Sequence, residues 1–189
     1  MRQGSDLEDI AVKLDRAAHH EAGHIVIAAV QVLRLRPAGL MVDQKGKGLA
    51  CYCKQPDDSD LSREHCIVAS LAGFKAEERF CEEHSCPAPH WLGVIGSGDS
   101  IDAREISTKL SVPAIYSELE NRSARLVEQH WTVITALAAA LLAKDWEPLK
   151  PLKSGGTWAE ATAAKYLTGE EVVGILARYG IVAVYDPTC

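Results

Sequence analysis

The chain has 189 residues, of which 47% are apolar and 24% are charged, and these proportions are typical of a folded protein. Its length predicts one domain, residues 1–189, with a core from about residue 6 to residue 180. Its formal net charge of -6 and the absence of any block of lysine or arginine exclude nucleic acid as an expected partner. No apolar run approaches the roughly 20 residues of a membrane span and the N-terminus does not resemble a signal peptide, so we expect a cytoplasmic protein.

The first half of the chain predicts two helices with a β-hairpin between them. Residues 6 to about 32 carry apolar side chains at helical spacing. Residues 40–53 form two short apolar runs around a Lys-Gly-Lys-Gly turn, which predicts a small hairpin. A second helix is predicted from about 61 to 83, and its small side chains would let another helix come close: Ala69, Ala72, Gly73 and Ala76.

The middle of the chain begins with an irregular connection. Residues 84–98 are rich in proline and glycine, and a connection of this length is often functional. A short helix is predicted to start near Asp99 or Ser100. The apolar pattern of residues 112–144 then predicts one long helix or a helical pair.

The last part of the chain predicts two short helices after a linker at residues 145–157. The first covers residues 157–167, and the second begins at the N-cap Thr168 and ends at Gly180. Together these elements predict a mostly α (α+β) fold with one small antiparallel β-hairpin or sheet.

The six cysteines are expected to be free thiols, because a reducing compartment disfavours disulfides. Cys51 and Cys53 lie two residues apart, so they point to one face of a strand. A thiolate zinc site is the alternative, but its spacings, C-x-C and C-x4-C, differ from the usual C-x2-C pairs. That alternative would use Cys51, Cys53, Cys81 and Cys86.

His20-Glu21-Ala22-Gly23-His24 forms the pattern HExxH within the first predicted helix. Residues four apart lie on one face of a helix, so the two imidazoles can bind one metal ion. Glu21 points elsewhere, where it can hold a metal-bound water and act as general base. His19 points off this face and is expected to be solvated or to support a ligand. The alternative is that the HExxH pattern occurs here by chance. However, two histidines and a glutamate on so apolar a helix need polar partners, and a metal ion is one such partner.

Two histidines leave a catalytic zinc site one protein ligand short. The extended pattern HExxHxxGxxH fails, because Ile27 and Val30 stand where glycine and histidine are needed. The third ligand must therefore come from farther along the chain. Spacing alone does not choose among the candidates, which are Glu64, Glu77, Glu78, His84, His90, Asp99 and Asp102.

Three segments, in order, resemble the protease domain of the FtsH-type ATP-dependent zinc metalloproteases. "HHEAGHIVIA" looks like the HEAGHA helix of that family, "LAGFKAEERF" like its L-x-G-R-x-A-E-E helix, and "GSGDSIDAREI" like its G-A-S-N-D-[LI]-x-x-A segment. "LVEQHWTVITALAAALLAK" and "YLTGEEVVGIL" are similar to its closing helices. The resemblance extends from about residue 12 to 178 and implies a helical, zincin-like metalloprotease domain.

The resemblance also implies roles for particular residues. The aspartate of the family's last motif is the third zinc ligand and matches Asp99, with Asp102 as the alternative third ligand. The first glutamate of A-E-E supports the site from behind the ligands and matches Glu77. The hairpin of residues 40–53 matches the strand to which an extended substrate adds its backbone.

The chain also departs from the family. Phe74 replaces the family's arginine, and the connection from Glu77 to Asp99 is longer than usual. The transmembrane and ATPase parts are absent, and no phosphate-binding loop G-x-x-x-x-G-K-[ST] occurs here. Any ATP dependence must therefore come from an ATPase partner in trans. The related proteases are hexamers, which leaves a homo-oligomer of this chain open.

Taken together, these features predict a zinc-dependent metalloendopeptidase that hydrolyses unfolded or flexible protein segments. Zn²⁺ would be held by His20, His24 and Asp99, with Glu21 as general base on a zinc-bound water. The alternative is a catalytically silent, zinc-stabilised module that binds peptides or regulates a partner. A metal-dependent hydrolase of another class, such as an amidase, is a third hypothesis.

Overall fold

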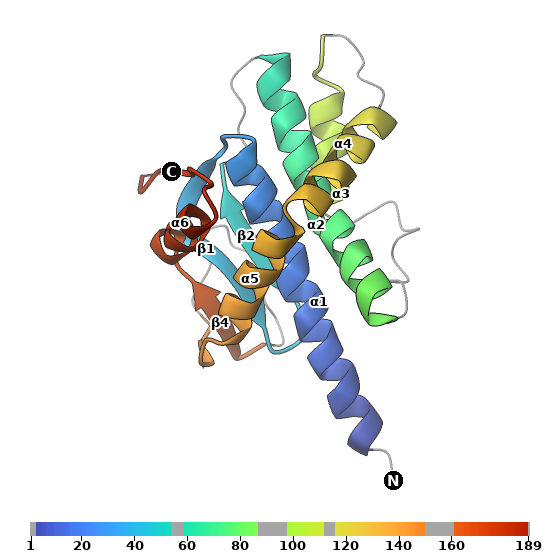
Figure 1. The fold of residues 1–189 in the computed structure, drawn as a ribbon, viewed down its shortest axis with the longest axis vertical. Coiled ribbons are helices and arrows are strands. Elements are labelled where there is room, and N and C mark those ends of the chain that lie inside the picture. Colours follow the sequence, from blue (N-terminus) through green and yellow to red (C-terminus); the bar gives the residue numbers. More distant parts are fainter. Residues whose placement is uncertain (1–2, 54–58, 87–97, 112–115, 150–160, 189) are drawn as a thin grey trace.

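The computed structural model describes residues 3–53, 59–86, 98–111, 116–149 and 161–188. This part of the chain forms helices packed around one small, mainly antiparallel sheet (Figure 1), which confirms the predicted mostly α (α+β) class. None of its helices is long and apolar enough to cross a membrane. In chain order the elements are α1 (Gln3–Val30), β1 (Arg34–Asp43), β2 (Gly48–Tyr52), α2 (Asp60–His84), α3 (Gly98–Ser107), α4 (Tyr116–Gln129), α5 (Trp131–Leu142), β3 (Glu147–Pro148), β4 (Ala163–Leu167), α6 (Gly169–Arg178) and β5 (Val184–Tyr185).

Helix α1 runs through the centre of the molecule. The sheet lies on one side of it and α2 on the other, and α5 also packs against it (Figure 1). Ile25, Val26 and Ile27 are consecutive and fully buried, and successive helical residues point about 100° apart. The C-terminal half of α1 is therefore covered on every side, which fixes the direction of His24, directly before these residues, and of His20 one turn earlier.

Helices α1 and α2 approach each other closely through small residues. A methyl group at Gly23 of α1 would lie 2.6 Å from the Cβ of Ala76 and 2.8 Å from the carbonyl oxygen of Ala72. Only hydrogen fits there, so the predicted stripe of small side chains is confirmed as the contact with α1. Ser59 starts α2 as its N-cap by accepting a hydrogen bond from the backbone N–H of Ser62.

The sheet is built around β1. Strands β2 and β4 pair antiparallel with β1, β3 pairs with β4, and the two-residue β5 pairs parallel with the start of β1. Strand β2 is therefore an end strand of the sheet that the structure describes. The predicted hairpin at 40–53 is confirmed, and β1 begins earlier, at Arg34. Buried Asp43 fixes the turn by accepting hydrogen bonds from the backbone N–H groups of Lys45 and Lys47.

The helix predicted at residues 157–167 is wrong where the structure describes that segment. Ala163–Leu167 is strand β4, with Leu167 opposite Leu40 and Ala164 opposite Asp43. Residues 157–160 lie outside the described part. Alanine favours a helix locally, but pairing with β1 satisfies the backbone and buries Ala164 and Leu167, so tertiary structure overrides local propensity.

The other helical predictions agree with the described part of the chain. Helix α3 begins at Gly98, next to the expected start. Within 112–144 the structure has the helical pair α4 and α5, separated at His130. Thr168 caps α6 in a reciprocal capping box with Glu171. Strand β3 falls within the predicted linker, of which 150–157 lie outside the described residues.

The expectation of free thiols is confirmed for four cysteines and wrong for Cys53, which is bonded in a disulfide. A disulfide depends on which residues the fold brings together, and sequence spacing does not show this. The cysteines form no metal-binding group within the part of the chain that the structure describes. The free thiols belong to Cys51, Cys66, Cys81 and Cys86.

Candidate metal centre

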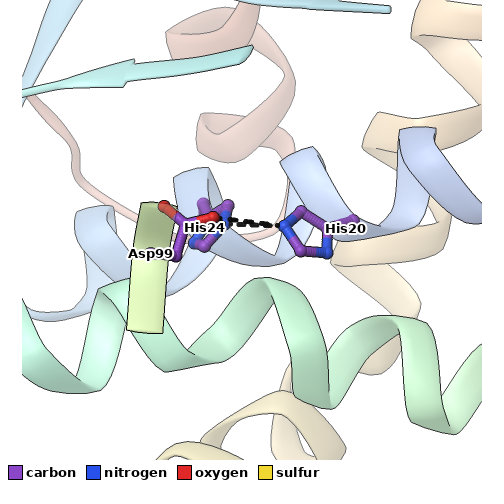
Figure 2. Close-up of side chains that lie close together, drawn as sticks. All are labelled: His20, His24 and Asp99. Carbon is purple, nitrogen blue, oxygen red and sulfur yellow. Dashed lines mark hydrogen bonds and ion pairs between the residues drawn. The ribbon is translucent and has the colours of Figure 1, made fainter. Parts of the chain in front are cut away.

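Three side chains from α1 and α3 converge on a single point. Among the described residues, His20, His24 and Asp99 form a group whose ligand atoms all lie within 4.8 Å of one another. The histidines lie on successive turns of α1, and Asp99 faces them from the first turn of α3 (Figure 2). The HExxH pattern and the aspartate 75 residues beyond it in the sequence are thus joined in one site.

The distances within this group match a metal's coordination shell. The two Nε2 atoms of His20 and His24 are 3.1 Å apart, and the Oδ2 atom of Asp99 lies 3.5 Å and 3.2 Å from them, respectively. Ligands bound at about 2.0–2.1 Å to a tetrahedral zinc ion are about 3.3 Å apart. The three atoms therefore have the dimensions of one face of such a tetrahedron, and the residues fit a zinc ion with one corner open.

The other nitrogen of each ring is held by an acceptor from α2. Nδ1 of His20 donates to the Glu77 carboxylate at 3.1 Å, and Nδ1 of His24 donates to the carbonyl oxygen of Ala69 at 2.8 Å. With the proton on Nδ1, each Nε2 offers its lone pair to the shared point. Glu77 is 3% exposed, so the supporting role that the resemblance implies agrees with its position.

Arg16 belongs to the same network, and sequence reasoning did not single it out. Its Nε atom lies 3.0 Å from Oε1 of Glu77, which makes an ion pair on the side away from His20. Arg16 precedes His20 by four residues and therefore shares its helix face, which is the signal that could have identified it. The carboxylate is thus fixed from both sides, between a guanidinium and an imidazole.

Gly73 gives the metal centre its space. A methyl group at this position of α2 would lie 2.7 Å from Nε2 of His20 and would also collide with the ring of His24. Gly73 belongs to the stripe predicted to admit a helix, but at this point the space faces the two ligand atoms. The glycine at residue 73 therefore has two effects: it lets the helices pack closely, and it leaves room for the two ligand atoms.

The charges around His20 favour a cation. Burial lowers the pKa of His20, but hydrogen bonds to Asp99 and Glu77, together with the charge of Glu21, outweigh it and raise the pKa to about 10. The carboxylates that attract a proton there attract a metal ion at the same point. The donor set of two imidazoles and one carboxylate is typical of catalytic zinc.

Glu21 is placed between the metal centre and the sheet. It is 7% exposed, and a methyl group at Gly48 would lie 2.5 Å from its Oε1 atom. Gly48 is the first residue of the end strand β2. The carboxylate of Glu21 is therefore set against the strand edge where an extended peptide could lie, while remaining outside the group of ligand atoms.

Among the described residues, none of the remaining candidates for the third ligand joins the group. Asp102 lies on α3 but is not a member, so the structure brings Asp99 and not Asp102 to the histidines. Three others have partners elsewhere: Glu64 pairs with Arg122, Glu78 pairs with Lys75, and His84 stacks on Phe80. His90 lies outside the described residues.

His19 is a packing residue, which corrects the expectation that it is solvated. It is 6% exposed, and its ring lies 4.6 Å from that of Phe80 and 5.4 Å from that of Trp131. Its Nδ1 donates to the carbonyl oxygen of Asp15. Burial lowers its pKa, so the ring stays neutral at pH 7. Helices α2 and α5 cover this face of α1, and sequence spacing does not reveal that cover.

Comparison with protein-family models and with curated proteins finds no match to this chain. The resemblance to FtsH-type proteases accordingly rests on its three motifs.

Proposed function

We propose that the protein is a zinc-dependent metalloendopeptidase related to the FtsH-type protease domain. The observation that carries the proposal is the convergence of His20, His24 and Asp99, whose ligand atoms are spaced as a tetrahedral zinc ion would require, with Glu21 beside this group and outside it. A structural zinc site is usually closed by four protein ligands, whereas three ligands and a nearby carboxylate suit catalysis.

The proposed chemistry assigns a separate task to each residue. A zinc ion bound there would lower the pKa of a water molecule and polarise the substrate's carbonyl group. Glu21 would accept the proton of the attacking water and then donate it to the leaving amine. Glu77 holds the proton on Nδ1 of His20, which keeps Nε2 of that ring available as a ligand.

The proposed substrates are unfolded or flexible protein segments. Strand β2 is at the end of the described sheet and begins beside Glu21, so an extended chain could pair with it by backbone hydrogen bonds. These 189 residues contain no phosphate-binding loop, so unfolding of a stable substrate would need an ATPase outside this sequence. Four free cysteines fit a cytoplasmic site of action, although Cys53 is disulfide-bonded.

The experiment compares the wild type with Glu21→Gln. Zinc content is measured on the purified proteins, and cleavage of casein, a flexible protein, is followed by electrophoresis and mass spectrometry. We expect about one zinc per chain in both proteins and a loss of about 100- to 10,000-fold in activity in Glu21→Gln. Glu78→Gln, at a carboxylate paired with Lys75, serves as control and should retain activity. Zinc in both proteins with no cleavage by either would favour the silent peptide-binding module.

A further inference from the structure

An open cavity of about 240 Å³ lies directly beside the metal centre. Helix α1 contributes residues to its lining, including His20 and Glu21, and so does the β1–β2 turn. Glu77 of α2 completes the lining. Because the cavity shares His20 and Glu21 with the metal centre, a group bound in it would lie next to the reacting peptide bond. The other lining residues are Lys13, Arg16, Ala17, Lys45, Gly46 and Gly48.

Basic side chains outnumber acidic ones in this cavity, although the chain as a whole is acidic. Lys13, Arg16 and Lys45 line it together with the carboxylates of Glu21 and Glu77, while the net charge of the protein is -6. Arg16 pairs with Glu77 through its Nε atom. Its two terminal nitrogens have no hydrogen-bond or ion-pair partner in the described part of the chain. The ammonium group of Lys45 likewise has no ion pair among the described residues. Planar guanidinium donors suit a carboxylate, which they can bind with two hydrogen bonds.

The wall that carries Lys45 is rigid. Asp43 accepts hydrogen bonds from the backbone of Lys45 at 2.8 Å and of Lys47 at 2.9 Å, and it is 1% exposed. Gly46 has φ +74, and a methyl group there would lie 3.3 Å from both the Cβ and the carbonyl oxygen of Lys13. The turn is therefore seated on α1, which brings Lys45 and Lys13 to the same cavity before any substrate arrives.

We propose that this cavity is a subsite that binds a carboxylate of the substrate next to the scissile bond. The inference rests on the proposed peptidase function and adds a preference for negatively charged substrate positions. The carboxylate has two chemical sources, an acidic side chain or the C-terminus of the peptide. Arg16, Lys13 and Lys45 would supply the basic groups that bind it.

The first test maps the sites at which the protein cleaves denatured proteins. Four synthetic peptides are then made around a mapped site. They carry Glu or Gln at the position that would enter the cavity, and each of these two is made with a free and with an amidated C-terminus. For the wild type we expect replacement of the carboxylate to lower kcat/KM by about tenfold, and by less at high salt. Loss on Glu→Gln identifies the side chain as the source, and loss on amidation identifies the C-terminus. Equal cleavage of all four peptides would overturn the proposal.

Variants assign the effect to the cavity. In the double variant Lys13→Gln/Lys45→Gln, the preference for the peptide with the carboxylate over the peptide without it should fall to about twofold or less. The variant Lys45→Glu should instead prefer a peptide with a basic residue at that position. Lys47→Gln is the matched control, because Lys47 is on the same turn but does not line the cavity. A preference that is unchanged in the double variant, or that falls equally in the control, would contradict the assignment.

A binding measurement separates this proposal from the proposed catalysis. Zinc-loaded Glu21→Gln is titrated with short fluorescent peptides that differ only by Glu or Gln, and fluorescence anisotropy gives Kd. Tighter binding of the Glu peptide that is lost in the double lysine variant supports the subsite even if no protein cleaves. Cleavage by the wild type without any such preference overturns the subsite and leaves the peptidase standing. Equal binding of both peptides, or none, overturns the subsite as well.

Discussion

Nε2 of His20 faces Nε2 of His24 at 3.1 Å. Each ring also directs Nδ1 at an oxygen acceptor of α2, so neither Nε2 carries a proton when both rings are neutral. With both rings neutral, two lone pairs at this distance would repel each other, and either a proton on one Nε2 or a metal cation at the shared point removes that repulsion. The two histidines of this apolar helix are thus placed to hold a cation together with Asp99.

Removing the metal should loosen the fold. A ligand present at about 1,000 times its Kd stabilises a protein by about 4 kcal/mol. For a chain of this size, Tm should therefore fall by on the order of 10 °C when a chelator is added, and it should recover with zinc. Differential scanning calorimetry of the purified protein checks this. An unchanged Tm in a preparation shown to contain zinc would mean that the ion is not bound within the fold.

Gly73→Ala should abolish tight zinc binding without unfolding the protein. The added methyl group collides with both histidine rings, which must turn away, while alanine favours the helix by about 1 kcal/mol relative to glycine. Gly174→Ala on α6 is the control, since no atom lies within 4 Å of its added methyl group. Zinc affinity by chelator competition should fall at least about tenfold in the first variant only. Full affinity in Gly73→Ala would contradict the placement of the site.

Glu77→Gln should weaken zinc binding by about 10- to 100-fold, because the charge that orients His20 and pairs with Arg16 is lost. Glu78→Gln provides a comparison on the same helix, where the carboxylate pairs with Lys75 and does not contact a ligand. The two affinities are measured by competition with a chromogenic chelator. Equal affinities in the two variants would show that Glu77 only packs there.

His19 and His20 should behave differently although they are adjacent. His19→Ala removes a ring packed against Phe80 and Trp131, so it should lower the free energy of unfolding by about 2–3 kcal/mol and leave the zinc content unchanged. His20→Ala should lose the zinc. Urea unfolding and metal analysis of both variants provide the two measurements. Loss of zinc from His19→Ala at a temperature where it is folded would contradict the distinction.

The spacing of His20 and His24 is sufficient to predict that their imidazoles lie together, because a regular helix places residues four apart on one face. Helix spacing does not predict the role of Asp99, because it lies 75 residues farther along the sequence than His24. Only the resemblance to FtsH-type proteases selects Asp99 from the other carboxylates and histidines. The structure brings its carboxylate to both rings.

The errors came from contacts between distant segments. Residues 163–167 have good helix formers but pair with β1, and His19 is buried by α2 and α5. The helix packing predicted for Gly73 is confirmed, but its closeness to the histidine rings depends on how α2 crosses α1 and does not follow from the sequence. Helical periodicity describes one element at a time, and these features depend on how two elements meet.

Zinc-edge X-ray absorption of the zinc-loaded protein tests the central claim most directly, because it measures the kind and distance of the atoms bound to the metal. The account predicts a shell of nitrogen and oxygen atoms at about 2.0–2.1 Å, with outer-shell scattering from two imidazole rings. Replacing Asp99 by alanine should remove one oxygen from that shell. A sulfur shell at about 2.3 Å, as in a site built from the cysteines, would contradict the assignment to His20, His24 and Asp99.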